Sequence, residues 1–321
     1  MGEFELIRNY FAAAPCAQDG EGVALGIGDD CALLALPPGE QLAISTDTLV
    51  AGVHFPDACD PFLLGQRALA VSASDLAAMG ARPVAFTLAL TLPQVEADWL
   101  QAFAEGLNLM AQGCSLRLVG GDTTRGPLSL TLTVFGAVPA GQALTRSGAR
   151  EGDLLCVGGA LGDAAAALPL VLDQRRVAPS IAEPLLARYW SPEPQLALGQ
   201  ALRGKATAAL DISDGLLADC GHIARSSAVR LLVERDKLPM SGPLLQLFDL
   251  PEAQQAALSG GDDYRLAFTL PPEHLPGLLE AGWPVHVIGR VVEGQGVALL
   301  DADGHDITPA ALGYQHFRSE A

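Results

Sequence analysis

Residues 115–138 read Ser-Leu-Arg-Leu-Val-Gly-Gly-Asp-Thr-Thr-Arg-Gly-Pro-Leu-Ser-Leu-Thr-Leu-Thr-Val-Phe-Gly-Ala-Val, and this stretch decides the fold class of the chain. It predicts two strands, over 115–120 and 127–138, with no helix between them. In the second strand leucine and valine alternate with serine and threonine, the period-two pattern of a sheet with two unlike faces. Strands that are adjacent in sequence favour an α+β domain with a mixed or antiparallel sheet over a simple doubly wound domain.

Helix and strand signals alternate on the N-terminal side of this stretch. The sequence predicts a strand over 41–47 that runs into a polar tip, and a helix over 61–79 that a proline opens and a glycine stops. A strand over 84–92 and a second helix over 96–112 follow. The first part of the chain is therefore expected to form one α+β domain.

A domain boundary is indicated at residues 139–152, which lack periodicity and contain three glycines. The expected domains are residues 1–140 and 141–321. In the second domain we expect strands at 153–157, 207–211, 229–234, 264–270, 285–291 and 296–300, and helices at 161–172, 180–189, 194–203 and after 215. The expected fold class is a two-domain α+β or α/β protein whose C-terminal domain is an α/β sandwich around a mixed sheet.

Composition excludes several classes of protein. The chain has 321 residues and a net charge of −18, so it would repel phosphate backbones and anionic lipid, and we expect neither a nucleic-acid nor a membrane role. No apolar run is long enough for a transmembrane helix, and no secretory signal is seen, so a cytoplasmic protein is expected. The six scattered cysteines form no C-x-x-C pair, which disfavours zinc and redox roles.

Six short acidic clusters carry the chemical information, because carboxylates beside glycines and hydroxyls are the hard oxygen ligands that Mg²⁺ prefers. The clusters are Gly28-Asp29-Asp30, Ser45-Thr46-Asp47, Ser74-Asp75, Gly120-Gly121-Asp122-Thr123-Thr124, Asp211-Ile212-Ser213-Asp214-Gly215 and Gly260-Gly261-Asp262-Asp263. We expect nearly all of them at strand ends or helix starts. The chain has only two lysines, Lys205 and Lys237, so phosphate charge must be met by arginine, metal and backbone amides.

Some of these residues have a functional and a purely structural interpretation. Asp75 lies inside a predicted helix among alanines, where it is either a ligand that faces a polar cavity or simply on the exposed side. Ser213 or Asp214 is expected to cap the helix that follows, and a helix start also suits phosphate. Arg146 is a candidate phosphate clamp or a solvated linker residue, and His54 is a ligand contact or a structural histidine.

The motifs together resemble the thiamine-monophosphate kinase family, in the superfamily of aminoimidazole ribonucleotide synthetase and selenophosphate synthetase. The resemblance covers nearly the whole chain. The stretch Ser45-Thr-Asp-Thr-Leu-Val-Ala-Gly-Val-His54 and the late Gly313-Tyr-Gln-His-Phe317 are the most specific to this family, whereas the aspartate motifs are shared by the superfamily.

The resemblance implies a set of site residues and an assembly. Several Mg²⁺ ions would be held by Asp30, Ser45, Thr46, Asp47, Asp75, Asp122, Asp211 and Asp214. ATP, the co-substrate, would contact Gly121, Asp122, Arg146 and Ser213, and thiamine monophosphate would contact His54, Asp262 and Tyr314. The N-terminal sheets would join two copies into a homodimer with a shared barrel.

The function that we expect is ATP-dependent phosphorylation of thiamine monophosphate to thiamine diphosphate. The acceptor is already a phosphate, so no dedicated general base is required; Asp47, Asp122 and Arg146 are expected to carry catalysis by in-line positioning and charge stabilisation. The alternatives are another ATP-dependent synthetase of the superfamily, such as an aminoimidazole ribonucleotide synthetase, and a non-catalytic sensor of Mg²⁺ and nucleotide.

Overall fold

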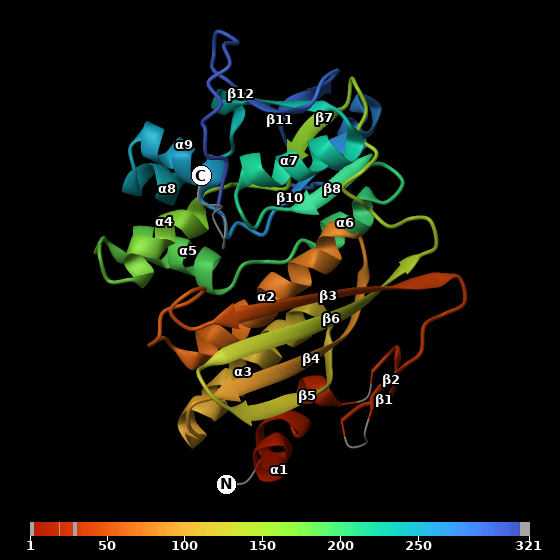
Figure 1. The fold of residues 1–321 in the computed structure, drawn as a ribbon, viewed down its shortest axis with the longest axis vertical. Coiled ribbons are helices and arrows are strands. Elements are labelled where there is room, and N and C mark those ends of the chain that lie inside the picture. The colour runs from red at the N-terminus through yellow and green to blue at the C-terminus, as the bar shows by residue number, and fades with distance from the viewer. Residues whose placement is uncertain (1–2, 19, 28–30, 315–321) are drawn as a thin grey trace. The chain divides into compact units, whose positions relative to one another are not determined.

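The chain folds into two compact units in the computed structural model, which describes residues 3–18, 20–27 and 31–314 (Figure 1). Unit 1 comprises Met1–Ala77 and Ala81–Ala143, and unit 2 comprises Ala78–Gly80 and Leu144–Ala321. The expected two-domain α+β architecture with mixed sheets is confirmed. Across the described residues no helix is both long and apolar enough to span a membrane.

Unit 1 is built on a four-stranded mixed sheet in the order β3-β6-β4-β5. The strands are β3 (Glu40–Val50), β4 (Arg82–Leu92), β5 (Arg117–Arg125) and β6 (Ser129–Pro139). β6 pairs antiparallel with both β3 and β4, whereas β4 and β5 run parallel. The two strands that are adjacent in sequence, β5 and β6, are therefore separated by β4 in the sheet.

Two acidic clusters lie inside strands, so their predicted position at strand ends is wrong. β3 continues past Ser45–Asp47 to Val50, and β5 continues through Gly120–Thr124. The reason is that one face of the sheet accepts polar β-branched residues, which suit a pleated surface. On that face Thr46 and Thr133 are joined across the strands by a hydroxyl hydrogen bond of 2.9 Å.

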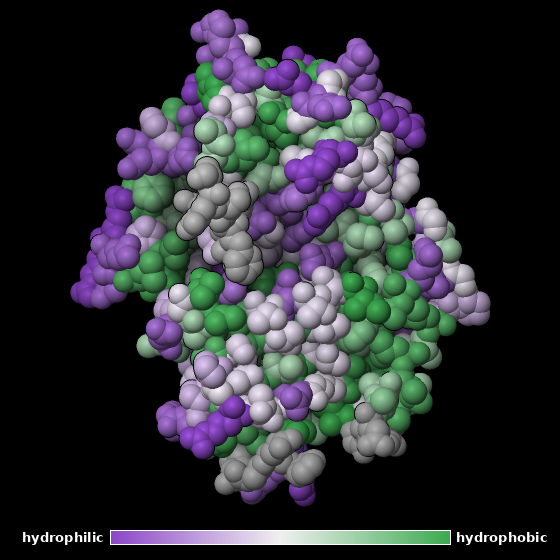
Figure 2. Space-filling view, in the orientation of Figure 1, coloured by the Kyte–Doolittle hydropathy of each residue, from purple (hydrophilic) through white to green (hydrophobic). Residues whose placement is uncertain are grey.

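The other face of this sheet is buried, as the alternation in 127–138 predicts. Leu130, Leu132 and Val134 of β6 are completely buried. Helices α2 (Pro61–Ala78) and α3 (Ala97–Cys114) lie behind the sheet in Figure 1 and cover this face. The open face, on the viewer's side, is mostly white and green in Figure 2.

Helices α2 and α3 touch at a pair of glycines. A Cβ atom at Gly106 of α3 would overlap the carbonyl oxygen of Phe62, and one at Gly65 of α2 would overlap that of Phe103. Backbone contact of this kind is open only to glycine. The smaller elements of unit 1 are α1 (Glu3–Leu6), η1 (Ile7–Ala12), η2 (Pro15–Ala17) and the antiparallel pair β1 (Val23–Leu25) and β2 (Leu33–Leu34).

Unit 2 is built on a six-stranded sheet in the order β12-β9-β11-β7-β10-β8. Its strands are β7 (Leu154–Val157), β8 (Ala208–Asp211), β9 (Arg230–Glu234), β10 (Leu266–Leu270), β11 (His286–Val292) and β12 (Gly296–Leu300). β12 and β9 run parallel and the other neighbours antiparallel, so this sheet is also mixed. Leu155 and Cys156 point to opposite faces and are both completely buried, so protein covers both faces here.

The helices of unit 2 connect these strands. They are α4 (Asp163–Val171), α5 (Pro179–Trp190), α6 (Leu196–Leu202), α7 (Leu216–Ser227), α8 (Gly242–Leu247), α9 (Leu250–Ser259) and α10 (Leu275–Glu280), with the short turns η3 (Arg235–Lys237) and η4 (Pro272–His274). α8, α9 and α10 are not among the expected helices. A capping signal precedes the first two, since Ser241 caps α8 and Asp249 forms a capping box with Glu252 in α9.

Candidate active site

Unit 1 brings two carboxylates of the acidic clusters together between a strand and a helix. The Ser45 hydroxyl of β3 donates a hydrogen bond to Asp75 Oδ2 of α2, and the Ser72 side chain bonds to Asp47. The pairing of β3 with β6 explains why these side chains face the helix. Ser45 and Asp47 lie opposite residues of β6 that point to the buried face of the sheet. Asp75 is half-buried and faces this strand, so it does not lie on the exposed side of its helix.

The electrostatics of this pair favour a cation. Burial, and then the charge of Asp75, raise the pKa of Asp47 to about 6. Two neighbouring carboxylates that have lost much of their hydration repel each other, and a bound cation removes that cost. Carboxylate and hydroxyl oxygens fit the hard-ligand preference of Mg²⁺, so Ser45, Asp47 and Asp75 suit such an ion.

Register places Thr46 and Asp122 on the open face of the sheet. Asp122 is exposed and pairs with Ala89, which pairs with Thr131 of the open face. Thr46 lies on this face through its bond to Thr133. The side chains of Thr46 and Asp122 are thus on the face opposite that of Asp47.

The neighbouring strand β4 leaves room only for glycine at position 121. Its φ is +156°, and a Cβ atom there would overlap the Leu88 carbonyl oxygen of the neighbouring strand. His54 lies in the turn after β3, where its Nδ1 accepts a hydrogen bond of 3.0 Å from the Val50 amide. Asp30, expected as a metal ligand, lies outside the described residues.

In unit 2 the segment Asp211–Gly215 leaves the end of β8 and enters α7, as predicted. The predicted cap is wrong, because Gly215 occupies the N-cap position and no side chain caps the helix. Instead Asp219 Oδ2 accepts hydrogen bonds from the amides of Ser213, Asp214 and Gly215, at 3.0, 3.0 and 3.2 Å. Burial raises the pKa of Asp219 to about 7, although these three bonds favour its charged form.

Asp219 is a site residue that the motif analysis missed. It lies in the first turn of α7, a position that favours acidic residues and was the available signal. Its carboxylate sets the conformation of the loop that carries Ser213, which is exposed, and Asp214, which is half-buried.

Two other segments of unit 2 pack against this loop. The amide of Asp262 donates to the Ser213 carbonyl at 2.8 Å, and the amide of Tyr314 donates to the Asp214 carbonyl at 3.0 Å. The structure therefore brings Ser213, Asp214, Asp262 and Tyr314 together. Asp262 has a φ of +61°, uncommon for a residue other than glycine, and its Oδ1 accepts a bond of 3.0 Å from the Tyr264 hydroxyl.

Arg146 reaches the same region from the start of unit 2. It is exposed, and its carbonyl accepts a hydrogen bond of 3.2 Å from the Ser227 hydroxyl of α7. Burial, and then the positive charges of Arg146 and Arg225, lower the pKa of His222, whereas Asp214 acts in the opposite direction. His222, which the sequence analysis did not select, is thus within electrostatic reach of both Arg146 and Asp214.

Each unit thus offers an oxygen-rich acidic group, and unit 2 adds an arginine and exposed hydroxyl and phenol groups. The family model described as "AIR synthase related protein, N-terminal domain" matches residues 28–138. The model of the corresponding C-terminal domain matches residues 150–301. Fold and site together define a protein of this AIR synthase-related class.

Individual relatives narrow the class further. The chain is 46% identical to the thiamine-monophosphate kinase of Salmonella typhimurium, over 98% of each chain. It resembles the crystal structure of the thiamine-monophosphate kinase from Stenotrophomonas maltophilia, with 44% identity, a TM-score of 0.86 and coverage of 95% and 97%. It also resembles AaThiL complexed with AMPPCP and TMP, with 31% identity, a TM-score of 0.79 and coverage of 88% and 89%. The chain belongs to the thiamine-monophosphate kinase family.

Proposed function

We propose that the chain transfers a phosphoryl group from ATP to thiamine monophosphate, which yields ADP and thiamine diphosphate. The observation that carries the proposal is the pairing of Asp47 with Asp75 beside Ser45, a group whose chemistry calls for a divalent cation. Family membership gives the reaction, and a relative 31% identical to the chain binds AMPPCP and TMP. The cytoplasm is the compartment in which we expect it to act.

Mg²⁺ is the metal that these oxygen ligands suit, and we assign several ions to the site. The proposed ligands are Asp30, Ser45, Thr46, Asp47, Asp75, Asp122, Asp211 and Asp214. The side chains of Thr46 and Asp122 lie on the sheet face opposite that of Asp47, so these two would hold an ion other than the one at Asp47. When bound, Mg²⁺ screens the negative charge of the two phosphate groups that must approach each other.

The chain's own residues bind and orient the reactants. Arg146, exposed near Asp214, is proposed to clamp a transferring phosphate, because a guanidinium can donate two parallel hydrogen bonds. Gly121 lets the backbone approach the nucleotide closely, and the exposed Ser213 hydroxyl is a further contact to ATP. The acceptor is a phosphate oxygen, which is nucleophilic without a general base, so positioning and charge stabilisation supply the catalysis.

Thiamine monophosphate is assigned to His54, Asp262 and Tyr314. The backbone bonds that hold Asp262 and Tyr314 against the Ser213–Asp214 loop support a shared role for these two residues. Asp262 offers a carboxylate for the cationic thiamine ring system, and Tyr314, half exposed, offers a flat aromatic surface.

The proposed assembly is a homodimer in which two N-terminal sheets close into a shared barrel. Leu42 and Ile44 of the edge strand β3 are 41% and 58% exposed, and the sheet face that they occupy is only weakly polar (Figure 2). An exposed apolar edge strand invites pairing with another chain. In this proposal residues 1–140 bind ATP and metal and dimerise, and residues 141–321 complete the site.

Incubation of the purified protein with ATP, Mg²⁺ and thiamine monophosphate, followed by chromatographic separation of the products, tests the function. Equal amounts of ADP and thiamine diphosphate are expected. If no thiamine diphosphate forms, the proposal fails. Phosphate release with a purine precursor would then favour a synthetase, and nucleotide binding without turnover a sensor.

A further inference from the structure

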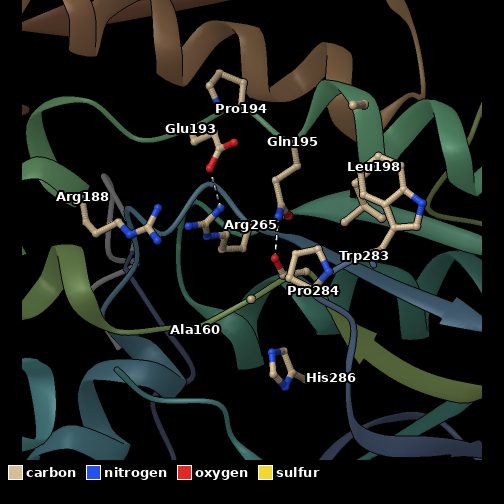
Figure 3. A pocket seen from close by; sticks show the side chains of 13 residues that line it. Ala160, Arg188, Glu193, Pro194, Gln195, Leu198, Arg265, Trp283, Pro284 and His286 are labelled. Carbon is tan, nitrogen blue, oxygen red and sulfur yellow. Dashed lines mark hydrogen bonds and ion pairs between the residues drawn. The ribbon is translucent and has the colours of Figure 1, made fainter. Parts of the chain in front are cut away.

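A cavity of about 350 Å³ lies within unit 2, and none of its lining residues is among those assigned above to the candidate active site. The Gly158–Ala160 segment after β7 forms its floor, the segment around Gln195 one wall, and Trp283 to His286 another (Figure 3). This volume is in the range of small-molecule sites.

One end of the cavity holds two arginines (Figure 3). The Arg265 side chain is only 7% exposed, and its ion pair with Glu193, whose side chain is 77% exposed, is 3.9 Å long. Arg188 forms a similarly long pair of 3.9 Å with Asp163. Burial, and then the nearby positive charge of Arg188, lower the pKa of Arg265, whereas the carboxylates of Glu193, Asp263 and Asp163 act in the opposite direction. Both ion pairs are long, and burial raises the pKa of Asp163 and of Asp263, which favours the neutral forms of these carboxyl groups, so the two guanidinium groups can take a further anion.

The arginine end is held in place by the surrounding backbone. Gln195 is buried; its amide nitrogen donates to the Gly158 carbonyl and its oxygen accepts from the Leu266 amide at 2.8 Å. Leu266 follows Arg265 directly and starts β10, so this bridge fixes the arginine relative to the cavity floor. A Cβ atom at Gly158 would overlap the Gln195 side chain, so the bridge depends on glycine at this position.

The opposite end of the cavity is apolar and flat. Leu198, Trp283 and Pro284 line it, on the far side of Gln195 from the arginines in Figure 3. Trp283 is half-buried and lines the cavity, so part of its aromatic side chain can contact a ligand there. A cavity with a positively charged end and an aromatic end is complementary to a ligand that has an anionic group and a planar ring.

We propose that this cavity binds a small anion whose phosphate or carboxylate group lies between Arg188 and Arg265 and whose planar ring lies against Trp283. The site is additional to the proposed kinase function and requires no turnover. Its occupant is either a free aromatic anion or one of the reaction's own phosphorylated compounds, and the two sources are separated experimentally.

Phenyl phosphate is a suitable probe, with phenol as its neutral counterpart. Titration of the full-length protein, with AMPPCP and thiamine monophosphate present at saturation, is followed by tryptophan fluorescence. We expect saturable quenching by phenyl phosphate and little by phenol. Arg188→Gln should weaken binding at least about tenfold, because a charge-assisted bond to the anion is lost. Arg176→Gln is the matched control, since Arg176 is 85% exposed and pairs with Asp173 away from the cavity.

Two further variants make the test decisive. Trp283→Phe should remove the quenching, because the other tryptophans, Trp99 and Trp190, do not line the cavity. Arg265→Gln should weaken binding as Arg188→Gln does, and calorimetric titration checks both variants without the optical signal. Equal affinity in wild type and in Arg188→Gln would overturn the proposal. Quenching that appears only when AMPPCP and thiamine monophosphate are left out is decided by the Arg188→Gln variant. If the variant loses this quenching, one of those phosphorylated compounds is the occupant; if the variant retains it, the proposal is overturned, because the probe then occupies the catalytic site.

Discussion

Asp47 is the residue on which the metal proposal depends most directly. Asp47→Asn keeps the shape of the side chain but removes the charge that a divalent ion requires. We expect turnover to fall about 100-fold or more, since loss of metal-based charge stabilisation removes several kcal/mol from the transition state. Phosphoryl transfer assays over a range of Mg²⁺ concentrations measure the effect.

The matched control is Asp98→Asn, at an exposed position in the first turn of α3. It should keep nearly full activity. Circular dichroism checks that the Asp47→Asn protein is folded. If the folded variant turns over substrate as fast as the wild type, the assignment of Asp47 as a metal ligand is refuted.

Asp47 should also make the stability of the metal-free protein depend on pH. In the folded chain its pKa is about 6, against an ordinary value of 3.8. Between these values the folded state retains a proton that the unfolded state has released. The free energy of unfolding therefore falls as the pH rises from about 4 to about 6, and it falls no further above that.

Thermal melts in EDTA measure this effect as the difference between wild type and Asp47→Asn, in which the position cannot titrate. Added Mg²⁺ should reverse the loss above pH 6, because the metal binds the ionised carboxylate. A difference between the two proteins that does not change over this pH range would contradict the environment described for Asp47.

At the scale of elements, the loop before α7 depends on a carboxylate inside the helix. Asp219→Ala leaves the amides of Ser213, Asp214 and Gly215 without their acceptor, and we expect a loss of about 1–3 kcal/mol in the free energy of unfolding. Asp219→Asn retains an acceptor oxygen and should lose less. Urea denaturation gives both values; equal losses would show that charge, and not hydrogen bonding, holds the loop.

The crossing of α2 and α3 gives a second prediction at this scale. Gly106→Ala should destabilise unit 1 by about 1–3 kcal/mol, because its Cβ would overlap the backbone of α2 at Phe62. Gly113→Ala lies in the same helix, where nothing approaches within 4 Å, and should instead stabilise by about 0.5–1 kcal/mol. Melting temperatures that shift in the same direction for both variants would contradict the close crossing.

At the scale of the whole molecule, the proposed homodimer depends on the exposed edge of unit 1. Ile44→Asp puts a charge into an apolar interface, so a monomer is expected in light scattering at micromolar concentration. Val95→Asp changes a residue of similar exposure, 49%, outside that strand and should remain dimeric. A monomeric wild-type protein would refute the proposed assembly.

Much of this architecture can be predicted from the sequence, because long elements carry strong periodicity. The alternation in 127–138 correctly predicts the buried face of β6, and helices α2 and α3 fall within a few residues of their expected bounds. The ends of β3 and β5 could not be predicted, since threonines and glycines that resemble a loop lie on an open sheet face. Asp219 was missed because it acts on amides four to six residues before it.

The cavity around Arg265 left no pattern in the sequence, because its lining comes from separate segments between Gly158 and His286. Each segment is unremarkable by itself: two glycines after a strand, a glutamine before a helix, a tryptophan after a turn. Only the order of the strands in the six-stranded sheet brings them together.

The hydrogen bonds to Asp219 also limit what the start of α7 can bind. Amides at a helix start commonly hold a phosphate group. Here a carboxylate of the chain itself already takes that place, as an internal substitute for the anion. A nucleotide phosphate would have to displace Asp219 to bind in this way. The side chains that the loop offers instead are the exposed Ser213 hydroxyl and the half-buried Asp214 carboxylate, so a phosphate that binds beside it must be met by an arginine such as Arg146 or by a bound cation.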